Sequence, residues 1–308
     1  MIEIFTSTGQ KLLRHPDLIQ SWKEGCPVPH SLQVALTEKC NLNCKFCSVA
    51  NRERKYEWNL DDLISATEKF IRLGTKTVEI TGGGEPLCYP DIFPYVHYLI
   101  NRGMRIGLIT NGIGINLHLD WVRFIDWLRI SANVYDYLGK IELPSAHMGT
   151  LGFSYVWTEG ISSLETLRKI KKIALENRVD YIRLVPDCTK DIEKQNEFLE
   201  KIAEEIGPPL FLQRKIFKSP NHCYWGYLKP FLYCDGYVYP CSSMVLNLDA
   251  DKQFHESYRV CHWTEIEKIW GETVKSLVDT AKCGHCVFSH QNEMLEYSLS
   301  KQSHEEFI

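Results

Sequence analysis

The fold of this chain is restricted most by a regular alternation of short apolar runs with longer amphipathic stretches between residues 31 and 206. The apolar runs have the length of strands and lie at residues 32–36, 77–80, 105–109, 127–131, 151–157 and 181–185. The intervening stretches repeat apolar residues at helical spacing, as in the helix that we expect Asn59 to cap and Gly74 to end. Strands that alternate with helices form parallel βαβ units, which predicts an α/β fold.

Further helices are expected at 91–102, near 119–125, from 162 to 177 and at 191–206. The third begins with a capping box, in which Ser162 is followed three residues later by Glu165. The interval 133–150 differs, because it carries Gly139, Pro144 and Gly149 and has no clean helical period. We expect either a degenerate helix or a loop there, and a loop would reshape the substrate opening on that side.

The chain divides into three expected parts. Residues 1–30 contain a short alternating piece from Ile2 to Phe5 and are too few for a domain, so they are expected to pack on the main domain as an N-terminal lid. The main domain spans 31–206, and the Gly-Pro-Pro sequence at 207–209 marks its end. Residues 207–308 form a second unit with short strands, many aromatic residues and paired cysteines.

Three cysteines, Cys40, Cys44 and Cys47, come directly after the first strand, which we expect to end at Cys40. On a loop, this spacing lets three thiolates converge on one side of a metal cluster, and thiolates are the ligands that iron–sulfur clusters take. Three ligands leave one iron with an open position, which favours a catalytic role. A zinc knuckle or buried thiols are the alternatives.

The octapeptide from Cys40 to Cys47 resembles the C-x3-C-x-aromatic-C signature of the radical S-adenosylmethionine (SAM) superfamily. Two further motifs of that family follow in order, a glycine motif at 82–86 after the second strand and Thr-Asn-Gly at 110–112 after the third. The resemblance implies a partial (β/α)6 TIM-type barrel that holds a [4Fe–4S] cluster and SAM. It also implies reductive cleavage of SAM to a 5′-deoxyadenosyl radical that abstracts hydrogen from a C–H bond.

The resemblance also implies roles for single residues. The three cysteines would bind the cluster, and Phe46 would lie near the adenine of SAM. The backbone of Gly82, Gly83 and Gly84 would approach SAM closely, since glycine has no Cβ. Other expected cofactor contacts are Glu85 or the nearby backbone for the methionine ammonium, Ser131 for the ribose or carboxylate, and Asn111 and Arg183. For Asn111 a turn cap, and for Arg183 an ion pair within the barrel, are equal interpretations.

A second set of cysteines lies in the C-terminal unit. Cys223, Gly236, Cys241 and the Cys283–Cys286 pair resemble the pattern of the shortened SPASM module, called a twitch domain, which is a small α+β unit. The resemblance implies one auxiliary [4Fe–4S] cluster ligated by Cys223, Cys241, Cys283 and Cys286. No cysteine follows Cys286, so a second auxiliary cluster is not expected. A structural zinc site made by the same four thiolates is the alternative.

The other five of the twelve cysteines are expected to be small buried hydrophobes, and they are Cys26, Cys88, Cys188, Cys234 and Cys261. Cys188 is singled out because it follows the sixth strand, at the barrel mouth. In radical SAM epimerases a thiol can donate the hydrogen that quenches the substrate radical, and Cys188 is the candidate for that role. Cys234 precedes the Asp-Gly turn and is an alternative cluster ligand.

Composition narrows the cellular setting. No run of eighteen apolar residues exists, and residues 1–12 lack a secretory signal, so no membrane association is expected. Twelve cysteines without an export signal favour a reducing, cytoplasmic location and metal ligation. The net charge of −4 disfavours a broad surface for nucleic acid.

The leading prediction is a radical SAM enzyme that epimerises, isomerises or dehydrogenates a small or medium substrate, with flavodoxin or ferredoxin as external electron donor. The second keeps this chemistry but acts on a peptide, as maturases of ribosomal peptides do, or on a nucleic acid or modified nucleotide. The short segment before Cys40 leaves no room for a leader-binding domain, whereas the basic run at 52–55 could hold a polynucleotide. The third is a non-catalytic binding protein stabilised by metal.

Overall fold

The computed structural model describes residues 5–6, 8–245, 252–270, 274–283 and 286–300. Its strands form one curved sheet in the order β10-β9-β8-β1-β2-β3-β4-β5-β6-β7. The central strands are all parallel, and their bounds are β1 (Ser31–Ala35), β2 (Thr77–Thr81), β3 (Arg105–Thr110), β4 (Trp127–Ser131), β5 (Thr150–Trp157) and β6 (Tyr181–Pro186). An α/β fold with a partial TIM-type barrel is confirmed.

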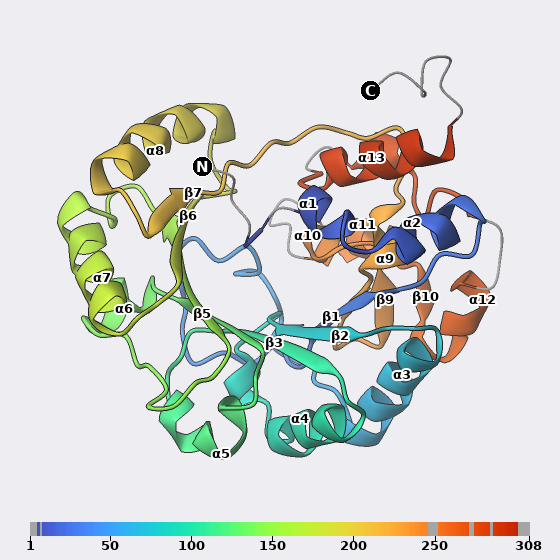
Figure 1. Cartoon of the computed structure of the whole chain (residues 1–308), viewed down its shortest axis with the longest axis horizontal. Helices are drawn as coiled ribbons and strands as arrows, with labels where there is room; N and C mark the ends of the chain where they lie inside the picture. Colours follow the sequence, from blue (N-terminus) through green and yellow to red (C-terminus); the bar gives the residue numbers. More distant parts are fainter. Residues whose placement is uncertain (1–4, 7, 246–251, 271–273, 284–285, 301–308) are drawn as a thin grey trace.

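Helices cover the convex face of this sheet (Figure 1). They are α3 (Leu60–Arg72), α4 (Ile92–Asn101), α5 (Leu119–Val122), α6 (Val134–Leu138), α7 (Leu164–Glu176) and α8 (Ile192–Ile206). Short 3-10 turns lie at Pro86–Cys88 and Ile115–His118. Because side chains alternate along a strand, residues such as Leu32, Ile80 and Leu128 are buried against the helices, whereas Gln33, Glu79 and Arg129 line a cavity on the concave face. The interior of the barrel is therefore polar.

Several local predictions are confirmed and others need correction. Asn59 caps α3, because its side chain accepts from the N–H groups of Asp61 and Asp62. The interval 133–150 contains the five-residue α6 and is otherwise loop until β5 begins at Thr150. The first strand ends at Ala35 and not at Cys40. The cap of α7 is Ser163 and not Ser162, because Ser163 has extended backbone and its side chain accepts from the N–H of Thr166.

The sheet continues past the boundary predicted at 207. Strand β7 (Leu210–Leu212) pairs in parallel with β6, so the residues after 209 still belong to the barrel sheet. On the opposite edge, β8 (Phe231–Leu232) pairs in parallel with β1, and β9 (Tyr237–Tyr239) and β10 (Cys261–His262) follow in antiparallel order. The C-terminal part of the chain therefore extends the barrel sheet at both edges.

The remaining helices gather beside this second edge. They are α1 (Thr8–Leu12), α2 (Pro16–Lys23), α9 (Trp225–Leu228), α10 (Ser242–Val245), α11 (Lys252–Ser257), α12 (Ile266–Trp270) and α13 (Ser289–Leu299), with 3-10 turns at Trp263–Glu265 and Thr280–Lys282. Helix α2 packs on α13, and the buried Trp22 indole donates to the carbonyl of Leu295 at 3.0 Å. The N-terminal segment thus packs on the C-terminal helix, while Phe5 stacks on Tyr181 of β6 at 4.5 Å and residues of α1 and α2 line the barrel cavity. The lid on the main domain stays a prediction. The piece expected at 2–5 lies, apart from Phe5, outside the described residues.

Among the described residues, no helix has both the length and the apolar character that a bilayer crossing requires.

Candidate active site

The cysteines Cys40, Cys44 and Cys47 lie on the loop between β1 and α3, and each is partly exposed. The backbone turns back on itself here, since the N–H of Cys47 donates to the carbonyl of Cys44 at 3.1 Å. Burial, followed by the charges of Cys47 and Cys40, raises the pKa of Cys44 to about 11. Thiols this close oppose one another's ionisation unless a metal offsets their charge, so the loop fits a cationic cluster.

The glycine motif lies directly against this loop. A Cβ added to Gly84 would come within 2.0 Å of the Lys39 carbonyl oxygen, and the N–H of Glu85 donates to the same oxygen at 2.8 Å. A Cβ on Gly83 would come within 2.8 Å of the Tyr233 ring. Glycine is therefore required here for the close approach of chain segments, in addition to any contact with SAM.

Glu85 and Asn111 join the glycine motif to the turn that ends β3. The buried Glu85 carboxylate accepts from the Thr110 hydroxyl and from the N–H of Asn111, the latter at 2.7 Å. Burial raises the pKa of Glu85 above its ordinary value, although these hydrogen bonds oppose the rise. The Asn111 amide donates to the Asn41 side chain at 2.7 Å, inside the cysteine loop. The three motifs that are separated in sequence thus meet in one place.

The other predicted cofactor residues are placed less closely. Phe46 is partly buried on the cysteine loop. Ser131 lies opposite Ser154 of β5, which in turn lies opposite Arg183 of β6. The Arg183 guanidinium donates to the Ser154 hydroxyl and to Gln213, both at 2.9 Å, so these partners hold it within the barrel. Contacts of these residues and of Glu85 with SAM stay predictions.

Four residues that sequence reasoning missed support the cysteine loop. The Tyr137 hydroxyl of α6 accepts from the N–H of Lys45 at 3.0 Å. The Tyr233 hydroxyl donates to the buried Glu38 carboxylate at 2.6 Å and joins the C-terminal part to the loop. Arg52 donates to the Glu38 carbonyl at 2.8 Å and lies 3.6 Å from the Cys47 sulfur. Of the four, only Glu38 and Arg52 lie near the cysteines in sequence.

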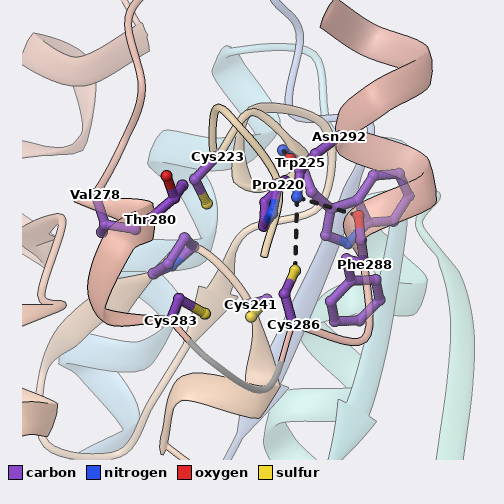
Figure 2. Close-up of a pocket in the computed structure, with 11 residues that line it drawn as sticks. Pro220, Cys223, Trp225, Cys241, Val278, Thr280, Cys283, Cys286, Phe288 and Asn292 are labelled. Carbon is purple, nitrogen blue, oxygen red and sulfur yellow. Dashed lines mark hydrogen bonds between the residues drawn. The ribbon is translucent and has the colours of Figure 1, made fainter. Parts of the chain in front are cut away.

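The second cysteine set also comes together. Cys223, Cys241, Cys283 and Cys286 line one pocket, whose other walls are largely apolar, and Figure 2 shows their sulfur atoms around a common space. Burial raises the pKa of Cys223 well above its ordinary value, and the charges of Cys241 and Cys283 add to this. Such thiols ionise only with a strong cationic partner, so the donor set fits a metal group. Within the described residues, no three His, Cys, Asp or Glu side chains are arranged to ligate a single metal ion.

Asn292 of α13 holds this pocket together and was not predicted. Its buried side-chain oxygen accepts from the N–H groups of Tyr224 and Trp225, each at 2.7 Å. Its amide donates to the Phe288 carbonyl at 3.1 Å and lies 3.9 Å from the Cys286 sulfur (Figure 2). One side chain thus connects the segments that carry Cys223 and Cys286. An asparagine six residues after a cysteine gave no signal in sequence.

The remaining cysteines are spread over the molecule. Cys26 and Cys188 are exposed, which corrects the expectation that they are buried, and Cys88 and Cys261 are partly buried. Cys234 is buried beside Glu38, whose charge adds to burial in raising its pKa, and it does not line the pocket of the four thiols among the described residues.

A cavity of about 1090 Å³ occupies the concave side of the barrel. Its wall includes Gln33, Glu79, Arg129 and Arg183 from four different strands, together with residues of α13 and of the segment after β7. Trp225 and Phe288, whose rings stack at 5.7 Å, line both this cavity and the pocket of the four thiols. The cavity and the second cysteine site are therefore neighbours that share one aromatic wall.

Both the sequence and the fold are similar to those of known proteins. Residues 34–137 match the family model described as the radical SAM superfamily. The chain is 34% identical over 153 residues to molybdenum cofactor biosynthesis protein 1 of Dictyostelium discoideum, a match that covers 47% of this chain but 23% of that protein. It is 24% identical over 257 residues to a probable GTP 3′,8-cyclase of Methanococcus maripaludis, covering 67% of this chain and 86% of that one. The chain thus spans less than a quarter of the molybdenum cofactor protein.

Among solved structures, the fold is similar to that of Streptococcus suis SuiB bound to its precursor peptide SuiA. The TM-score is 0.54 at 16% identity, and the match covers 84% of this chain and 71% of that chain. SuiB bound to S-adenosylmethionine matches with a TM-score of 0.53 at 15% identity, covering 98% of this chain and 84% of that chain. At this identity the likeness concerns the fold.

Proposed function

The chain belongs to the radical SAM superfamily, and from this premise we propose that it is an enzyme that reductively cleaves SAM and abstracts hydrogen from a C–H bond of a small or medium substrate. One observation carries the proposal: the cysteine loop, the glycine motif and the Asn111 turn, which are far apart in sequence, are joined by direct hydrogen bonds. In a binding protein that had kept these motifs by accident, no chemistry would require the three motifs to lie together.

The chain's own residues prepare the site. Cys40, Cys44 and Cys47 would hold the [4Fe–4S] cluster, and Asn111 and Tyr137 fix the loop that carries them. Gly82 to Gly84 would present backbone groups to SAM, because no Cβ blocks the approach. When bound, the cluster and SAM supply one-electron cleavage and hydrogen abstraction. The polar side chains of the barrel interior would hold and orient the substrate.

We further propose that Cys223, Cys241, Cys283 and Cys286 hold one auxiliary [4Fe–4S] cluster in a twitch-like unit. The apolar pocket of four thiols supports this, as does the aromatic wall that it shares with the barrel cavity. A group in that position could relay electrons or help to position substrate. A zinc site made by the same thiolates is the competing assignment.

The net reaction is proposed as epimerisation, isomerisation or dehydrogenation. Epimerisation needs a hydrogen donor, for which Cys188 remains the candidate. It is exposed and is not among the described residues that line the cavity, although its surroundings include Lys215 and Arg183. We also propose an external donor such as flavodoxin or ferredoxin, and a cytoplasmic location because thiolate-bound clusters require reducing conditions.

A peptide substrate is the second candidate. It is favoured by one observation, the similarity in fold to SuiB, which was solved with its precursor peptide. A small substrate is favoured by the extent of the match to a probable GTP 3′,8-cyclase, which covers most of that protein.

The test is anaerobic reconstitution with iron and sulfide, followed by SAM and dithionite and measurement of 5′-deoxyadenosine. The wild-type protein is expected to form it. Cys44→Ala is expected to lower the rate of its formation at least about a hundredfold, because two cysteines no longer hold the cluster that carries the open iron. Cys26→Ala is the matched control, since Cys26 is exposed and lies outside both cysteine sets. Formation of 5′-deoxyadenosine by Cys44→Ala at the wild-type rate would contradict the proposal.

A further inference from the structure

The barrel cavity has an unusual charge distribution. Its wall contains three acidic side chains, Glu79, Asp126 and Glu293, among the described residues. Each already has a basic partner: Glu79 pairs with Lys229 at 3.0 Å, Asp126 with Arg105 at 2.9 Å and Glu293 with Lys218 at 2.5 Å. Each acidic side chain of the wall therefore already has one basic ion-pair partner, and the charges of Arg129 and Arg183 also act on Glu79.

Further cations face the same space. Arg129 of β4, Arg183 of β6 and Lys215, just after β7, all line the cavity. They are close enough to one another that burial, and then the charges of Arg183 and Arg129, lower the pKa of Lys215 to about 8. Asn196 fixes the backbone of Lys215 through hydrogen bonds in both directions. Three basic side chains, from β4, from β6 and from the segment after β7, thus converge inside the barrel.

Arg129 has an unused donor. Its Nε atom is buried and has no hydrogen-bond partner among the described residues, and its guanidinium lies over the Trp127 ring at 4.8 Å. Neither Arg129 nor Lys215 pairs with an acidic side chain within the described part of the chain. A buried charged donor without a partner costs free energy, so such groups in a cavity favour a site whose ligand completes them.

We propose that this cavity binds the phosphoryl group of a small phosphorylated substrate between Arg129, Arg183 and Lys215. The inference rests on the proposed function, because it specifies the chemical class of the substrate. A phosphate monoester carries between one and a half and two negative charges at neutral pH, about what several converging cations require. A single carboxylate carries one negative charge and would balance only one of these cations. The cavity volume leaves room for the rest of a molecule beside the phosphoryl group.

The test is a calorimetric titration of the reconstituted protein with ribose 5-phosphate. Ribose and succinate are titrated in the same way as comparisons. Ribose 5-phosphate is expected to bind at least about tenfold more tightly than succinate, and ribose is expected not to bind. Arg129→Gln should weaken ribose 5-phosphate binding about tenfold or more, because a charge-assisted hydrogen bond is lost. Lys215→Gln is a second variant, should Arg129→Gln fail to fold.

The matched control is Arg168→Gln. Arg168 is an exposed residue of α7 that pairs with Glu205 and does not line the cavity among the described residues. It is expected to bind ribose 5-phosphate like the wild type. Affinity should rise between pH 5.5 and 7 as the ligand loses its second proton near pH 6. The affinity for ribose 5-phosphate should fall above pH 8, because Lys215 loses its proton there. The charged and titratable groups that face Lys215 are Arg183, Arg129 and Cys188.

Equal binding of succinate and ribose 5-phosphate, or full affinity in both cavity variants, would overturn the inference. The proposed function fails separately, if the wild-type protein forms no 5′-deoxyadenosine whatever it binds. A protein that cleaves SAM but ignores phosphate esters would retain the proposed function and lose only this substrate class.

Discussion

At the scale of single residues, Asn292 shows how one amide can organise a site. Its oxygen accepts two N–H groups at the start of α9, and its nitrogen lies between the Phe288 carbonyl and the Cys286 sulfur. The side chain is 1% exposed, so water cannot replace these contacts. Each lost partner leaves a buried polar group unsatisfied, which is more costly than the net gain from an ordinary hydrogen bond.

Asn292→Leu is therefore expected to lower the free energy of unfolding by about 2 to 4 kcal/mol, because two buried N–H groups lose their acceptor. It should also reduce iron bound after reconstitution, from about eight atoms towards about four, since the segment of Cys286 is no longer held. Urea denaturation and iron analysis measure the two effects. Asn177→Leu, at the exposed end of α7, is the control. An unchanged iron content in Asn292→Leu would refute the role of Asn292 in holding the segment of Cys286.

At the scale of elements, helix ends show where local chemistry decides a boundary. Ser162 and Ser163 are neighbours with different tasks. Ser163 caps α7 through the N–H of Thr166, whereas the Ser162 hydroxyl accepts from the N–H of Thr158 at 2.8 Å and contacts the Tyr155 hydroxyl. The capping-box pattern placed the cap on Ser162 because the pattern depends only on sequence spacing, and Glu165 follows Ser162 by three residues. The structure places it on Ser163, whose backbone is extended.

Ser163→Ala is expected to lower the free energy of unfolding by about 1 kcal/mol, since an N-cap acceptor is lost. Ser163→Asp should retain the wild-type stability, because its carboxylate can accept from the same N–H and favours the helix N-terminus. Denaturation in urea distinguishes the variants. A loss in Ser163→Asp as large as that in Ser163→Ala would show that the effect does not arise from capping.

At the scale of the whole molecule, three contacts attach the C-terminal part to the rest of the chain. Trp22 of the N-terminal segment bonds to α13, Tyr233 bonds to Glu38 beside the cysteine loop, and Lys229 pairs with Glu79 on β2. Burial alone would raise the pKa of Glu79, but the charges of Lys229 and Arg129 hold it below its ordinary value. Both cysteine sites thus depend on contacts between distant parts of the chain.

Lys229→Met is expected to lower the free energy of unfolding by about 2 kcal/mol at pH 7. This loss lies between those for breaking a surface ion pair and a buried ion pair, because both partners are partly buried. A carboxyl group with a lowered folded pKa stabilises above its unfolded pKa, near 4.3, and loses this as pH falls through the folded value. The difference from the wild type should therefore shrink below pH 4. Adding Glu79→Gln should recover part of the loss at pH 7; a deficit independent of pH would refute the account.

The order of elements and the ligand types were readable from sequence. Apolar runs that alternate with amphipathic stretches placed all six central strands, because the periods of strands and helices differ and each strand buries one face against the helices. Loop 133–150 was readable because Gly139, Pro144 and Gly149 break any helical period. The motifs around Cys40, Gly82 and Asn111 were readable because thiolate ligation and close backbone approach each require particular residue types.

Other features depend on which segments meet in space. The chain alone determined that three thiols follow the first strand; only the tertiary structure brought Asn111 to Asn41, Tyr233 to Glu38 and Asn292 to the segment of Cys286. The same holds for the cations of the cavity, since Arg129 and Arg183 belong to different strands and carry no motif. Local periodicity records burial and turns within a few residues, whereas a contact across the molecule depends on packing that no short stretch contains.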